Sequence, residues 1–296
     1  MKYKRPPRIN KYGKQRAFID SPSRYVIVEA TTKAGKSVGM LIWLFEQALR
    51  GGEGGNYWWV APVSSQAKIM FRRLCRFIKS KDFYEKNETE LFIKLANGSI
   101  IWFKSADKPD SLYGDDVHAV VMDEFTRMKE DSWFAVRSTV SATQGKVRFI
   151  GNVKGTNNWG YRMARQAEQG RDNWSYFKLT AQDAIDAGVL SEQEIEDARD
   201  VLPNDVFLEL YFAIPNESKS NKFCFSFDRN RHVGPTNELP GYYYLSFDFN
   251  YNPICCSIFQ HTTTLIQCWR RSNYLTAIST TFAMLSRQST QASRIS

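Results

Sequence analysis

Residues 30–37 (ATTKAGKS) place the strongest constraint on what this chain can fold into. The segment matches the phosphate-loop (Walker A) template G-x-x-x-x-G-K-[ST] except at its first position, where alanine replaces glycine. The template requires a strand before the loop and a helix after it. Apolar residues 25–28 and the helical spacing of apolar side chains from Val38 onward fit both requirements. The sequence therefore predicts a phosphate site; the alternative is a lysine-rich turn with a capping serine.

Each residue type in this segment suits phosphate binding. Gly35 lets the backbone approach a phosphate closely, and successive N–H groups at a helix N-terminus favour anions. Lys36 would reach the β- and γ-phosphates of ATP, and the Ser37 hydroxyl would hold Mg²⁺. The expected ATP-binding residues are Thr31, Thr32, Lys33, Ala34, Gly35, Lys36, Ser37 and also Gln15, about twenty residues before Lys36, which would read the adenine edge.

Residues 117–124 (VHAVVMDE) give the second signal, a mostly apolar strand that ends in two carboxylates. In phosphate-loop ATPases such a strand delivers an aspartate to the Mg²⁺ shell, the role expected for Asp123. Glu124, directly after it, is placed to polarise the attacking water. The alternative is an acidic pair at the start of a surface turn. A phosphate loop followed by such a strand is much rarer by chance than either feature alone.

A third apolar strand, residues 146–150, runs into Asn152. A polar residue at that strand end can sense hydrolysis and pass it on, so Asn152 is the expected coupling residue; an ordinary asparagine in a turn is the alternative. Strands that alternate with helices predict an α/β fold. We expect a mainly parallel central sheet flanked by helices, with the ligand at the carboxyl ends of the strands.

The composition favours an acidic partner and an intracellular protein. The formal charge is +9 and the isoelectric point is near 9.2, which favours nucleic acid. Five cysteines without a C-x-x-C pair argue against a disulfide framework and a zinc site. The sequence shows no signal core and no membrane span. The helix predicted after Ser64 carries a basic face that can track a phosphate backbone, or simply be solvated: Lys68, Arg72, Arg73, Arg76 and Lys79.

Five parts are expected along the chain. Residues 1–16 form a basic arm, residues 17–155 an ATPase core, and residues 156–222 a helical lid or linker subdomain. Residues 223–240 are polar and contain glycine and proline, which predicts a linker. Residues 241–296 begin a further domain with a strand at 242–248, and their Ser/Thr-rich tail from residue 261 is expected to have low order.

In this order the motifs resemble the large terminase subunit of tailed bacteriophages. The resemblance rests on Gln15, ATTKAGKS, YWWVAP, VHAVVMDE, VRFIGN and YYYLSFDFNYNP. It implies an ATPase that pushes double-stranded DNA into a procapsid in the host cell cytoplasm, with ATP and Mg²⁺. It also implies a homo-oligomeric ring, a portal protein and a small terminase subunit as partners. It gives Lys36, Glu124 and Asn152 catalytic or coupling roles and makes Asp248 the first metal ligand of an RNase-H-like nuclease.

The chain departs from that family in two places. Residues 111–114 (SLYG) lack the arginine that acts on a neighbouring subunit's nucleotide, and Lys104, Arg127 or Arg137 could replace it. No Asp or Glu follows Asp248, although a metal nuclease needs several carboxylates. We therefore expect an absent or incomplete nuclease, for which a frameshift or truncation near Gln260 is one account. A helicase-like ATPase and a non-hydrolysing nucleotide- or DNA-binding remnant are the alternative functions.

Overall fold

The computed structural model describes residues 5–6, 12–52, 54–79, 81–215, 242–248, 255–261 and 266–272. The chain divides into two compact units, residues 1–219 and 220–296. Most of the predicted basic arm, the linker at 223–240 and most of the tail after residue 261 lie outside the described residues. Within the described part of the arm, Arg5 forms ion pairs with Glu46 and Asp20, both at 2.6 Å.

The first unit is built on an eight-stranded sheet in the order β3-β4-β5-β2-β6-β7-β1-β8. All neighbours from β5 to β8 are parallel, and β3 and β4 add an antiparallel edge. The predicted mainly parallel sheet flanked by helices is confirmed. The strands are β1 (Tyr25–Ala30), β2 (Asn56–Ala61), β3 (Tyr84–Asn87), β4 (Phe92–Leu95), β5 (Ile100–Ser105), β6 (Val117–Asp123), β7 (Lys146–Gly151) and β8 (Trp174–Leu179).

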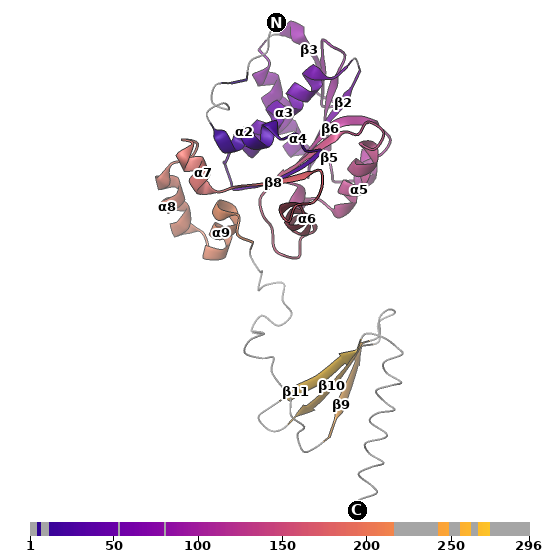
Figure 1. Ribbon diagram of the computed structural model, residues 1–296, viewed down its shortest axis with the longest axis vertical. Coiled ribbons are helices and arrows are strands. Elements are labelled where there is room, and N and C mark those ends of the chain that lie inside the picture. The colour runs from indigo at the N-terminus through magenta and orange to yellow at the C-terminus, as the bar shows by residue number, and fades with distance from the viewer. Residues whose placement is uncertain are drawn as a thin grey trace, which may run out of the picture. The chain divides into compact units, whose positions relative to one another are not determined.

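Helices cover both faces of this sheet (Figure 1). On one face lie α2 (Gly13–Asp20), α3 (Lys36–Arg50) and α4 (Ser64–Phe77), and on the other α5 (Glu130–Thr139) and α6 (Trp159–Glu168). Side chains along β1 alternate between the two faces of the sheet. Val26 and Val28 pack in the hydrophobic cluster with α3, whereas Tyr25 and Ile27 pack in the cluster with α5 and α6, so each face needs a covering layer of helices. Short 3₁₀ turns are η1 (Lys81–Phe83), η2 (Pro109–Leu112) and η3 (Phe125–Arg127).

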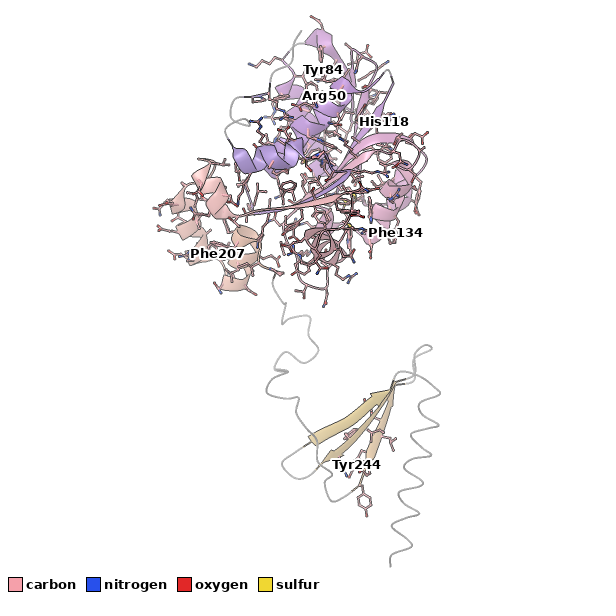
Figure 2. The ribbon with its side chains drawn as sticks, in the orientation of Figure 1. Arg50, Tyr84, His118, Phe134, Phe207 and Tyr244 are labelled. Carbon is pink, nitrogen blue, oxygen red and sulfur yellow. The ribbon has the colours of Figure 1, made fainter. Side chains whose placement is uncertain are left out.

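Residues 156–222, expected to be helical, also contain strand β8. This strand is only half-buried over most of its length, so its polar residues weaken the strand pattern in the sequence. Tyr176 on β8 donates a 2.6 Å hydrogen bond to buried Glu29 on β1, and Arg165 on α6 pairs with the same carboxylate. The helices that follow are α7 (Ala181–Asp186), α8 (Glu192–Val201) and α9 (Asn204–Phe212), which enclose a small core of their own around Phe207, labelled in Figure 2.

The second unit contains a three-stranded antiparallel sheet, in the order β11-β10-β9. Its strands are β9 (Tyr244–Asp248), β10 (Cys255–His261) and β11 (Ile266–Ser272). The expectation of low order after Gln260 is wrong for β11, because its backbone pairs with β10 from Ile266 to Ser272. Ladder hydrogen bonds need no particular side-chain pattern, so the residue pattern indicates this strand only weakly. No helix in the described part of the chain is long and apolar enough to cross a membrane.

Candidate active site

The predicted phosphate loop joins the carboxyl end of β1 to the first turn of α3. Gly35, at the N-cap of α3, has a φ of +85°, in the left-handed region that favours glycine. A Cβ atom there would lie only 2.8 Å from Nε2 of Gln15. The loop therefore requires glycine at this position for its backbone conformation, and a side chain there would also displace the end of Gln15.

Polar side chains from separate elements meet at Lys36. Its Nζ donates to Oδ1 of Asn152 at 2.7 Å and lies 3.1 Å from Oε1 of Glu124. Glu124 directly follows β6 and Asn152 directly follows β7. Because β1, β6 and β7 are parallel and β7 lies between the other two, their carboxyl ends open at one edge of the sheet. The first turn of α3, which follows β1, thus brings a largely buried ammonium group to two strand ends.

Ser37 and Asp123 form a second contact beside this cluster. Oγ of Ser37 donates to Oδ1 of Asp123 at 3.4 Å. Burial raises the pKa of Asp123 to about 7, and the neighbouring charge of Glu124 adds to the increase; Lys36 and Ser37 oppose it. A carboxylate and a hydroxyl are hard oxygen ligands of the kind that Mg²⁺ takes alongside substrate phosphates and water. The donor set therefore fits a magnesium ion, although the described residues hold no cluster of three or more His, Cys, Asp or Glu side chains.

The backbone around Glu124 is unusual. Glu124 has a φ of +53°, which is uncommon for a residue with a side chain, and it begins the η3 turn. Thr126 in that turn donates from Oγ1 to the carbonyl oxygen of Asn152 at 3.0 Å. Thr126 is not among the residues expected from the sequence, because a lone threonine after an acidic pair gives no signal that would identify it.

Gln15 lies against the predicted phosphate loop. Its Nε2 donates to the carbonyl oxygen of Gly35 at 2.7 Å, and the side chain is buried. A cavity of about 230 Å³ lies next to it; its lining residues are Tyr12, Gly13, Lys14, Asp183, Asp186 and Ala187. The structure thus places Gln15 at the backbone of the loop, and the adenine contact expected from the sequence stays a prediction.

Helix α9 also contacts the loop. The backbone N–H of Thr32 donates to the carbonyl oxygen of Leu210 at 2.9 Å, and that of Gly155 to Oε2 of Glu209 at 3.5 Å. Nδ2 of Asn152 donates to Oγ1 of Thr32 at 3.2 Å. The loop, the end of β7 and α9 are therefore joined through Thr32.

Solved structures with a similar fold include large terminases of bacteriophages. The large terminase ATPase domain of Thermus phage P74-26 has a TM-score of 0.59 and 22% identity, and the match covers 69% of this chain and 96% of that domain. The fold is that of a large terminase ATPase domain. The large terminase of a thermophilic bacteriophage matches with a TM-score of 0.59 and 17% identity, over 88% of this chain and 68% of that one.

The large terminase of bacteriophage HK97 matches with a TM-score of 0.61 and 12% identity. The match covers 90% of this chain and 63% of that protein, so the chain spans less than two thirds of its length. No protein-family profile and no curated protein matches the sequence.

Within this large terminase ATPase fold, three cations singled out from the sequence lie outside the Lys36 cluster. Lys104 stacks 4.0 Å above the Trp58 ring and pairs with Asp115 at 3.3 Å. Arg137 donates to Ser141 on the surface, and Arg127 is exposed in η3. Asp248 ends β9 in the second unit, and its side chain is outside the described set.

Proposed function

We propose that this chain is an ATP-hydrolysing motor subunit of the large terminase family, which moves double-stranded DNA into a viral procapsid. One observation carries the proposal: Lys36 contacts Asn152 at 2.7 Å and Glu124 at 3.1 Å, beside the Ser37–Asp123 pair. The fold and the +9 charge are consistent with it. The large terminase of the thermophilic bacteriophage has been solved in complex with ADP and with ATP-gamma-S, which supports nucleotide as the ligand.

Each residue has a distinct task in this proposal. Lys36 binds the β- and γ-phosphates, and the N–H groups around Gly35 cradle them. Ser37 and Asp123 would hold Mg²⁺, which neutralises phosphate charge. Glu124 orients the attacking water and accepts its proton. Most of the rate enhancement comes from positive charge fixed where negative charge develops.

Asn152 is suited to couple hydrolysis to movement, since it contacts both the ammonium group and the loop. Its side chain bonds to Lys36 and Thr32, and its carbonyl oxygen accepts a bond from Thr126. The carbonyl oxygen of Thr126 accepts a 2.8 Å bond from Asn158, the N-cap of α6. A change at Lys36 therefore has a bonded route through η3 to α6.

The same proposal implies a set of partners. Double-stranded DNA is the cargo, and the portal protein and the small terminase subunit are the packaging partners, with several copies of the chain in a ring on the procapsid in the host cytoplasm.

Two alanine variants test the ATPase assignment. Glu124→Ala should still bind ATP but lose about 10²–10⁴-fold in turnover, because it lacks the group that activates water. Lys36→Ala should lose turnover and also bind ATP more weakly, because it lacks the phosphate-binding cation. Steady-state hydrolysis, measured with and without duplex DNA, and nucleotide titration distinguish the two. Normal hydrolysis rates in both variants would overturn the assignment.

A further inference from the structure

The outer face of α4 and the residues just after it carry five exposed cations: Lys68, Arg72, Arg73, Arg76 and Lys79, hereafter the α4 cationic face. We propose that this face, together with Lys86 on β3, binds the phosphate backbone of double-stranded DNA. The inference rests on the proposed function, to which it adds the surface that holds the cargo. None of its residues contacts the Lys36 cluster in the described structure.

The spacing of these side chains suits a row of phosphates. Lys68, Arg72 and Arg76 recur every four residues and lie on one side of the helix. A rise of 1.5 Å per residue separates them by about 6 Å per step. Two successive phosphate steps on one DNA strand rise by about 6.8 Å along the axis, which is similar. The helix thus presents positive charge at nearly the spacing of every second phosphate.

The α4 cationic face lacks neutralising partners. In the described parts of the chain, none of its five residues takes part in an ion pair, in contrast to Arg5 or Lys104. Glu88 forms its ion pair with Lys86, and its pKa is lowered mainly by that hydrogen bond and slightly by Arg72 and Lys68. The five cations of the face thus keep a net positive charge, and that charge complements a polyanion.

A hollow next to α4 provides a place for a phosphate group. It has a volume of about 500 Å³, and its lining residues are Phe71, Arg72, Cys75, Arg76, Lys86 and Glu88. Strand β3 is fixed beside α4 because Tyr84, labelled in Figure 2, donates to the carbonyl oxygen of Cys75 at 3.4 Å. Lys86 is therefore held opposite Arg72 and Arg76. Two guanidinium groups and the Lys86–Glu88 ion pair line this concavity, and guanidinium groups match the oxygen geometry of a phosphodiester.

The salt dependence of duplex binding tests the inference. The full chain and the variant Arg72→Gln/Arg76→Gln are titrated against a fluorescent, blunt-ended DNA duplex of about 30 base pairs over a range of salt concentrations. Each lost phosphate contact reduces the slope of log K against log salt by about 0.9. The double variant should therefore bind more weakly, with a slope less steep by about 1.8.

Matched controls separate this inference from folding defects. Arg171→Gln/Arg199→Gln removes the same charge from exposed positions outside α4 and should keep the wild-type slope. Lys68→Gln/Lys79→Gln should reproduce the loss through different residues of the same face. An unchanged slope in both α4 variants would overturn the inference.

The ATPase rate in the absence of DNA distinguishes the two proposals. It should stay at the wild-type value in both α4 variants, because the face lies outside the nucleotide cluster. A wild-type chain that hydrolyses no ATP contradicts the proposed function. A chain that hydrolyses ATP and keeps its full salt slope without the α4 cations contradicts only the assignment of this surface.

Discussion

At the residue scale, Asp123 shows a conflict between folding and the proposed chemistry. Its carboxyl group is buried at the end of a central strand, next to the second carboxylate of Glu124. Burial disfavours the charged form, and the single hydroxyl contact from Ser37 only partly compensates. The fold therefore maintains an acid that is strained when ionised, which is the condition that a bound cation relieves.

The pH dependence of stability should reveal this strain. The pKa of Asp123 is about 7 in the folded protein against an ordinary 3.8, so between these values the folded state binds more protons than the unfolded state. Stability from this residue is then lost as pH rises from about 4 to 7. With a chelator present to remove divalent cations, Asp123→Asn should be more stable than the wild type, by an amount that rises with pH across that range to about 4 kcal/mol.

Urea unfolding at several pH values measures this difference. The exposed Asp172→Asn variant, with the same change of charge, serves as the control. Wild-type and Asp123→Asn curves that stay parallel from about pH 4 to 8 would show that the carboxyl group is not strained.

Sequence patterns locate some of these residues better than others. Lys36, Asp123 and Asn152 follow from motifs, because each stands at a fixed place relative to a recognisable strand. The contact of Gln15 with Gly35 and the bond from Thr126 to Asn152 depend on how separate elements pack. Such contacts have no local spacing in the sequence, so only the folded chain shows them.

At the scale of elements, the packing of α2 on α3 positions the loop. Gly39, near the start of α3, lies so close to α2 that a Cβ atom would meet Phe18 at 3.0 Å and Gln15 at 3.1 Å. Glycine usually weakens a helix, by about 1 kcal/mol relative to alanine. Here its small size allows α2 to bring Gln15 to the Gly35 carbonyl group.

Gly39→Leu should therefore destabilise the protein, although leucine favours helix. Overpacking between α2 and α3 is expected to cost about 1–3 kcal/mol and to weaken nucleotide binding by displacing Gln15. Val38→Leu, on an exposed neighbouring position of the same helix, should have little effect on either quantity. Urea unfolding and nucleotide titration compare the two variants; equal stability would mean that the two helices do not need this close approach.

The buried parallel strands could be predicted from the sequence, whereas two edge strands, β8 and β11, could not. Strands β1, β2, β6 and β7 are mostly apolar because helices cover both of their faces. Strand β8 forms one edge of the sheet, and β11 one edge of the smaller sheet. Edge strands keep polar residues at many positions, so their periodicity is weak.

At the scale of the whole molecule, the first unit should be able to act alone. The described elements up to α9 contain all residues of the Lys36 cluster, and the chain divides after Lys219. A chain that ends at Lys219 should keep the ATPase rate and the melting temperature of the nucleotide-binding unit. Calorimetry and hydrolysis assays on both lengths measure this; loss of hydrolysis only in the short chain would show that the second unit contributes to the site.

The hydrogen bond between Thr32 and Leu210 links the predicted phosphate loop to α9. Thr32 belongs to the predicted phosphate loop and Leu210 to α9, so nucleotide that changes the conformation of the loop would also change the position of α9. By thermodynamic linkage, a partner that binds α9 and changes the affinity for nucleotide by some factor would itself bind more or less tightly by the same factor when nucleotide is present. A neighbouring molecule that binds α9 would thus respond to whether nucleotide is bound, without contacting the nucleotide itself.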